Sequence, residues 1–289
     1  MKTTTTILTL AVAMLCAAGC DDPKIETGKT STPQLPEIEL PFETKGNPLP
    51  FEPHLASIRK GRKYLDDNKI TNYTALFGKQ ENLGGMTGLK KPEQMKVRFR
   101  EKPFSIAMAW TVNAGLADRM LYVAGRWKDR QGRDLMLVRP KGAVAQFLAG
   151  KSLLRRPDGP DAMKSALRPC TKFGLRNTIA DLERVYKAAT AKKECHEFFL
   201  GQTVHGNDKT PCYVIARLLP NKRPEYPAKT TYIFLDRKTF LPLRIIGYDW
   251  NDKLQCDYQY LSIKFNAGLT DAHFIPAACK IEPPKVDKK

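Results

Sequence analysis

The sequence lacks the motifs of the common enzyme classes. Its four histidines are scattered, and we find no HExxH, GxSxG, GxGxxG or P-loop pattern. There is no CxxC pair, and the spacing of Cys195, His196, His205 and Cys212 matches no known zinc finger. We therefore expect no enzyme activity, no cofactor and no metal site.

The chain also lacks a long apolar run, since none reaches the about 18 to 20 residues that a helix needs to span a bilayer. Residues 7–19 are apolar and have the length of the hydrophobic region of a signal peptide. They lead into Ala17-Ala18-Gly19-Cys20, which resembles a bacterial lipobox with Ala17 in place of the usual leucine. We expect residues 1–19 to be a lipoprotein signal peptide and Cys20 to carry a diacylglyceryl anchor on the extracytoplasmic side. The alternative is an ordinary secretory signal with Cys20 left as a free thiol.

Residues 20–52 lack a hydrophobic period, and six prolines lie between Pro23 and Pro50. Such a stretch cannot bury enough apolar surface to offset the entropy of ordering it. We expect a disordered, Pro-rich tether, followed by a single β-rich domain over residues 53–278 and a basic tail over residues 279–289.

The chain is short of acidic residues, and its formal net charge is +18. The tether is net acidic at −4, so residues 53–289 carry +21. A basic surface is expected from side chains that lie on outward strand faces or in a turn: Lys96, Arg98, Arg100, Arg126 and Lys128. Export argues against nucleic acid as a partner. Two interpretations stay open, solvation of the strand faces and attraction to anionic lipid or an envelope polymer.

Strand signals dominate the domain. Apolar Met95, Val97 and Phe99 alternate with basic residues, and beyond Pro103 the apolar positions shift by one residue. This shift predicts two antiparallel strands joined by a turn at 101–103. Further strands are expected at 73–81, 120–127, 133–138, 196–204, 212–219, 229–235, 241–248 and 254–265. The last should contain a bulge or be buried on both faces, because its apolar parity changes at Leu261.

Helical periodicity is confined to residues 55–67 and 171–189, and residues 140–170 are expected to be irregular. The fold class is therefore α+β and mostly antiparallel β. Five cysteines follow Cys20, and the sequence leaves open whether some form disulfides or all are buried thiols: Cys170, Cys195, Cys212, Cys256 and Cys279.

An ordered set of segments resembles the bacterial family "domain of unknown function 1571". The segments are Lys79–Glu81, Met95–Ser105 with Trp110, Leu121–Gly125, Arg156–Met163, Thr171–Leu175, Leu235–Arg244, Tyr258–Tyr260, Asn266–Asp271 and Phe274. The strand turn Asp236-x-x-Thr239-x-Leu241-Pro242 and the ending Asn266-x-Gly268-Leu269 are also similar to the periplasmic lipoprotein carriers LolA and LolB. This second resemblance implies an incomplete β-barrel wrapped around one or two helices, with acyl chains held in its apolar interior.

The resemblance implies a non-enzymatic, membrane-tethered envelope lipoprotein that binds acyl chains or another hydrophobic ligand. We expect the interior to be lined by Phe77, Val97, Phe99, Phe104, Ile106, Met108, Trp110, Leu121 and Val123. The alternative is an envelope sensor or interaction module with a solid core. Such a module would bind a protein or an anionic polymer through the basic surface.

Overall fold

The computed structural model describes residues 34–37, 39–43, 51–85 and 87–284. The predicted signal peptide, Cys20 and most of the tether lie outside these residues. The chain divides into Met1–Gln34 and Leu35–Lys289. All the elements below belong to the second unit.

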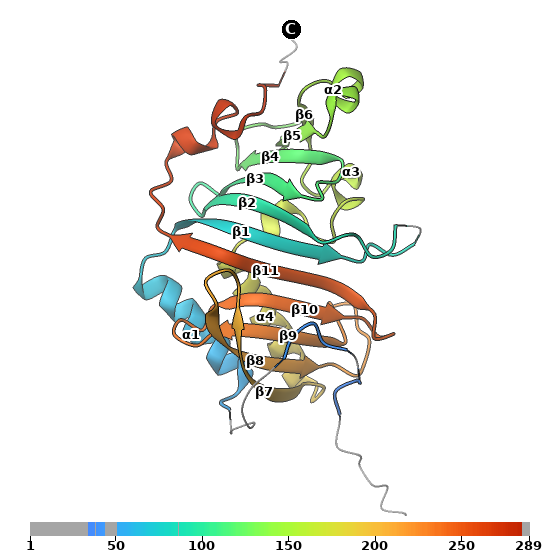
Figure 1. The fold of residues 1–289 in the computed structure, drawn as a ribbon, viewed down its shortest axis with the longest axis vertical. Helices are drawn as coiled ribbons and strands as arrows, with labels where there is room; N and C mark the ends of the chain where they lie inside the picture. The colour runs from blue at the N-terminus through green and yellow to red at the C-terminus, as the bar shows by residue number, and fades with distance from the viewer. Residues whose placement is uncertain (1–33, 38, 44–50, 86, 285–289) are drawn as a thin grey trace, which may run out of the picture. The chain divides into compact units, whose positions relative to one another are not determined.

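One antiparallel sheet of eleven strands forms the framework (Figure 1). Its first meander contains β1 Asn72–Glu81, β2 Glu93–Arg100, β3 Ser105–Val112, β4 Ala117–Val123, β5 Met136–Pro140 and β6 Leu153–Arg155. Its second contains β7 His196–His205, β8 Thr210–Leu218, β9 Thr230–Asp236, β10 Pro242–Tyr248 and β11 Leu254–Phe265. The strand order β6-β5-β4-β3-β2-β1-β11-β10-β9-β8-β7 leaves β6 and β7 as the two edges. The sheet is therefore open, and the two meanders join where β1 pairs with β11.

The predicted change of parity in the last strand is a β-bulge. Phe77 of β1 pairs with Tyr260, whereas the neighbouring Leu76 pairs with Ser262, so Leu261 has no partner in the ladder. Tyr258 and Tyr260 therefore share a sheet face with Ile263, although the spacing is odd.

The two long helices lie on one face of the sheet, which we call the inner face. These helices are α1 His54–Asp67 and α4 Leu175–Ala191, and they pack against each other (Figure 1). The α4 stripe of Ile179, Leu182 and Tyr186 is buried in the main core with apolar residues of the sheet. Gly174 packs directly against the aromatic ring of Phe99. A Cβ at position 174 would lie 2.8 Å from this ring, so the close packing depends on glycine.

The opposite, outer face is covered by the two ends of the unit. A C-terminal segment with the 3₁₀ turns Asp271–Phe274 and Ala277–Cys279 packs its buried Phe274 and Ile281 in a cluster with Leu121 and Leu137. At the other end, the ring of Phe42 meets those of Tyr232 and Phe234 edge-on. The sequence assigns Phe42 to the tether and Ile281 to the tail, and the structure packs both against the sheet. The domain boundaries themselves remain predictions.

The strands and both helices agree with the periodicities of the sequence, and the antiparallel, unclosed sheet is confirmed. The expectation that it wraps around the helices as an incomplete barrel stays a prediction. Residues 140–170 are less irregular than expected, because they contain α2 Ala143–Ala149, β6 and α3 Pro160–Met163. The five cysteines of the described part are free thiols, which answers the question of pairing for these residues. Within this part no helix is long and apolar enough to cross a membrane.

An apolar cavity as the candidate functional site

A cavity of about 680 Å³ lies on the inner face, between the sheet, α4 and residues 157–174, which we call the covering segment. This volume is typical of pockets for small ligands. Its apolar lining comes from strands of both meanders, from the covering segment and from α4: Phe77, Met95, Met108, Trp110, Met120, Met136, Val138, Leu153, Phe173, Leu182, Val185, Leu243, Ile245, Tyr258 and Tyr260.

Four methionines dominate the wall formed by the first meander. Met108 on β3 pairs directly with Met120 on β4, and Met95 and Met136 line the same cavity from β2 and β5. Unbranched thioether side chains adapt to ligands of different shape. This wall is therefore apolar, and its side chains can adapt to the shape of a ligand.

The cavity reaches the surface, because exposed residues such as Leu116, Lys164 and Arg168 belong to its lining. Beside this rim lies an apolar tip, formed by Leu116, Val144, Phe147 and Leu148. Phe147 of α2 is 88% exposed, and Ala145 of the same helix lines the cavity. Exposed apolar clusters of this kind mark contact surfaces.

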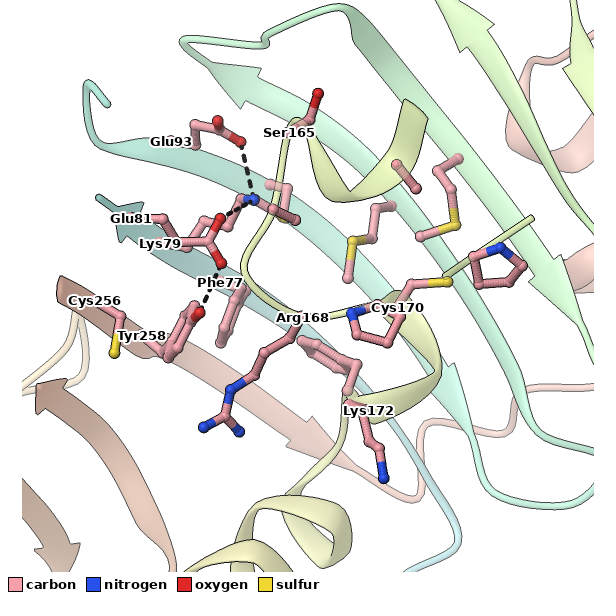
Figure 2. A pocket seen from close by; sticks show the side chains of 18 of the residues that line it. Phe77, Lys79, Glu81, Glu93, Ser165, Arg168, Cys170, Lys172, Cys256 and Tyr258 are labelled. Carbon is pink, nitrogen blue, oxygen red and sulfur yellow. Dashed lines mark hydrogen bonds and ion pairs between the residues drawn. The ribbon is translucent and has the colours of Figure 1, made fainter. Parts of the chain in front are cut away.

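A charged cluster of Lys79, Glu81, Lys90 and Glu93 lies at one edge of the cavity. Lys79 is directly opposite Glu93 in the β1–β2 ladder. Its Nζ lies 2.9 Å from Glu81 Oε2 and 3.7 Å from Glu93 Oε2, as Figure 2 shows. Lys90 Nζ lies 3.1 Å from Glu93 Oε1. Two cations therefore face two carboxylates, and the charges compensate one another.

The carboxylates of this cluster also bind neutral donors around the cavity. Trp110 Nε1 donates to Glu93 over 2.7 Å. The Tyr258 hydroxyl donates to Glu81 over 2.6 Å, as Figure 2 shows. The backbone N–H of Leu167 donates to Glu81 as well, at 3.3 Å. Burial, followed by the nearby charges, raises the pKa of Tyr258, which keeps this hydroxyl a donor. The cluster thus holds β1, β2, β11 and the covering segment together.

Arg217 lines another part of the cavity, on β8, and is 1% exposed. Its Nη2 donates to Thr231 Oγ1 over 3.0 Å, and its guanidinium lies 4.8 Å from the centre of the Tyr186 ring. Nε and Nη1 have no hydrogen-bond partner among the described residues. Burial lowers the pKa of this guanidinium from its usual range.

Charges on the lining favour anions. Eight basic side chains contribute to it against four carboxylates. The basic residues are Lys79, Lys90, Arg155, Lys164, Arg168, Lys172, Arg184 and Arg217. Figure 2 shows Arg168 and Lys172 extending from the covering segment, away from the charged cluster. The cavity is therefore apolar in its walls and positive in its net charge.

The expected lining residues fall into three groups. Phe77, Met108 and Trp110 line the cavity. Val97, Phe99, Phe104 and Ile106 belong to the main core, where Phe99 packs on Phe104 and Phe173.

Leu121 and Val123 belong to the outer-face cluster instead, against the C-terminal segment. The pleat of β4 turns Met120 and Tyr122 inward and so turns Leu121 and Val123 outward, which removes both from the lining.

Part of the expected basic surface is engaged within the chain. Arg98 donates to the carbonyl of Ala278 over 2.9 Å, and Arg126 donates to that of Phe274 over 2.6 Å. Arg100 pairs with Asp271 at 2.7 Å. Lys128 pairs with Asp134 at 3.1 Å, and Lys96 is exposed. Three of these cations therefore bind the C-terminal segment to the sheet.

The charged cluster and Arg217 were not predicted as site residues. The sequence places Lys79 and Glu81 in an expected strand and in a family segment, which by itself gives them no role in a site. Arg217 carried a usable signal, because it is a lone charge in the apolar run from Tyr213 to Leu219. A charge within a buried strand is rare unless it is paired or binds a ligand.

Comparisons with known proteins place the chain in a family. The family model "Protein of unknown function (DUF1571)" matches residues 70–281, as the sequence segments predicted. No curated protein matches the chain.

Several solved structures are similar in outline. A DUF1329 family protein from Desulfovibrio piger has 16% identity and a TM-score of 0.37, covering 79% of this chain and 100% of that one. The complex of MucA and MucB from Pseudomonas aeruginosa has 12% identity and a TM-score of 0.43, and the match covers 80% of this chain and 64% of that one. A LolA superfamily protein from Nitrosomonas europaea has 8% identity and a TM-score of 0.32, and the match covers 75% of this chain and 98% of that one.

Proposed function

The chain belongs to the family of unknown function DUF1571, and we propose that it is a non-enzymatic binding protein that holds acyl chains or a similar hydrophobic ligand in its cavity. In this proposal the open sheet acts as an incomplete barrel around α1 and α4, as in LolA-like carriers. The protein is exported and tethered to the envelope membrane through diacylglyceryl on Cys20.

The cavity itself carries the proposal. It combines a volume of about 680 Å³ with a wall of methionines and aromatic rings. An empty apolar space is costly to maintain, because its lining forgoes both packing contacts and hydration. Filling it with methylene groups gains about 0.8 kcal/mol for each one buried.

The apolar tip supports exchange of such a ligand with a membrane. Leu116 and Phe147 are exposed beside the rim of the cavity. A tip of this kind contacts the acyl region of a bilayer favourably, while basic residues nearby, such as Lys141, attract anionic headgroups. A ligand leaving the bilayer there enters the cavity without crossing water.

The alternative of a solid-core interaction module fits less well. It requires a filled interior, whereas a cavity is present. It also requires a free basic surface, whereas Arg98, Arg100 and Arg126 are engaged with the C-terminal segment.

Native mass spectrometry tests the proposal. The full-length Cys20→Ser chain, purified without detergent, should carry a bound amphiphile that organic extraction removes. A Met120→Trp variant should lose most of this ligand, because Met120 lines the cavity and the indole ring occupies the ligand's space.

A matched control is Val204→Trp, which adds the same ring at a position 60% exposed on β7. This control should retain the ligand. A folded protein free of bound amphiphile, which also fails to take up added fatty acid, would contradict the proposal.

A further inference from the structure

We propose that the ligand is an anionic amphiphile whose carboxylate or phosphate head binds Arg217, with its chain extending along the methionine wall. This inference rests on the proposed function and names the ligand class for the same cavity.

The first observation is an unbalanced charge. Arg217 is buried, and among the described residues it forms no ion pair and leaves Nε and Nη1 without acceptors. Glu197 lies opposite it in the β7–β8 ladder but accepts the backbone N–H of His54 at 3.0 Å. A buried cation without a counter-ion is strongly unfavourable, so it is retained where a ligand supplies the anion.

The charged cluster is the internal comparison. Its two lysines and two carboxylates satisfy one another within the chain, and Glu93 accepts from Trp110 as well. Both groups line one cavity, and of these two groups only the buried Arg217 has no carboxylate partner among the described residues. The chain thus compensates the buried charges of the cluster within itself and leaves that of Arg217 for a ligand head.

The chemistry of guanidinium selects the head. A guanidinium carries five N–H donors in one plane, and those of Nε and Nη1 have no acceptor among the described residues, so they can bind oxygens of a carboxylate or phosphate. Nη2 is held by Thr231, and the guanidinium lies beside the ring of Tyr186. These donors are therefore preorganised before the ligand arrives.

The position of Arg217 leaves room for a chain. β8 and β2 are five strand spacings apart in the sheet order, which is about 24 Å along the sheet at about 4.8 Å for each spacing. One leaflet of a bilayer needs about 15 Å for its acyl chains. A head at Arg217 therefore places its chain across Tyr258 and Phe77 toward Met95.

Calorimetric titration of the delipidated full-length Cys20→Ser protein tests the inference. The probes are dodecanoate, dodecyl phosphate, the neutral dodecan-1-ol and inorganic phosphate. We expect both anionic amphiphiles to bind at least about ten-fold more tightly than dodecanol, since hydrogen bonds to charged groups carry such factors. Inorganic phosphate alone should bind far more weakly than dodecyl phosphate.

Arg217→Met should abolish the preference for the anionic amphiphiles while leaving dodecanol binding within about two-fold, because methionine keeps the apolar bulk. Arg217→Lys should recover part of the preference, since it restores the charge without the planar set of guanidinium donors. Arg59→Met is the matched control: Arg59 is an exposed arginine of α1 outside the cavity lining, and its replacement removes the same charge. It should leave the preference intact. Urea unfolding should show that the Met variant is folded.

The outcomes separate the two proposals. Equal binding of dodecanoate and dodecanol by the parent protein overturns the anionic head and leaves the hydrophobic carrier standing. An equal loss in the Arg59 and Arg217 variants overturns the inference, since general electrostatics then explains the preference. Phosphate binding as tight as that of dodecyl phosphate assigns the site to a small anion and overturns the amphiphile. If no amphiphile binds at all, the carrier proposal fails together with the inference.

Discussion

His205 shows how a single buried side chain couples this fold to pH. Its Nε2 lies 3.1 Å from the carbonyl oxygen of Tyr260, and its ring packs on Phe234. Burial, and then the positive charge of Arg244, lowers the pKa of His205 from 6.5 to about 4. The unfolded chain therefore binds a proton between these values that the folded chain does not. The stabilising contribution of neutral His205 is fully present above pH 6.5 and is lost as the pH falls toward 4.

We predict that His205→Gln flattens the pH dependence of stability. Between pH 7 and pH 5 the parent should lose about 2 kcal/mol of unfolding free energy through this residue, at about 1.4 kcal/mol for each pH unit below 6.5. The variant should lose that much less over the same range. Urea unfolding at the two pH values measures the difference. Identical losses would show that His205 is protonated without cost in the folded protein.

For single residues, the sequence predicts the sheet face on which a side chain lies better than it predicts the residues that the side chain contacts. Met108 and Trp110 line the cavity from the sheet face that strand alternation assigns to them. The hydrogen bonds of Glu81 could not be predicted, because its donors Tyr258 and Leu167 come from distant parts of the chain. Only the folded sheet brings them together.

Elements were predictable wherever a period persisted. The β2–β3 hairpin follows from the apolar shift across residues 101–103, and α4 follows from a stripe beginning at Leu175. Short elements were not predictable, because α2 and β6 contain too few residues to show a period. The apolar composition of α2 would have favoured burial, and yet Phe147 is exposed.

The C-terminal segment behaves as an element of the core. Phe274 is 1% exposed in the outer-face cluster, and Arg100 lies over its ring. We predict that Phe274→Ala lowers the unfolding free energy by about 3–5 kcal/mol, as for other buried phenylalanines. The neighbouring Ile275→Ala is the control, because Ile275 is 39% exposed and should cost less than about 1 kcal/mol. Equal effects in urea unfolding would show that the segment is not part of the cooperative core.

For the whole molecule, charge and anchoring act together. An acidic stretch precedes a domain of net charge +21, counted over residues 53–289. If Cys20 is lipidated, this domain is held beside an anionic surface that attracts it.

Cys20→Ser should therefore move the protein from the membrane fraction to the soluble fraction of the cell. Asp21→Ser, which leaves the thiol, should remain with the membrane. Fractionation followed by immunoblotting measures both. Membrane retention of the serine variant would exclude the lipid anchor.

The pairing of β1 with β11 has a consequence for the order of folding. Tyr73 pairs with Phe265, so the centre of the sheet joins residues almost 200 positions apart in the chain. If the chain is exported with its N-terminus first, as proposed, β1 leaves the translocation channel long before β11 does. The first meander must wait with an unpaired edge, and closing so long a loop slows the final step. The sheet, and the cavity between the two meanders, can therefore form only after β11 is also available to pair with β1.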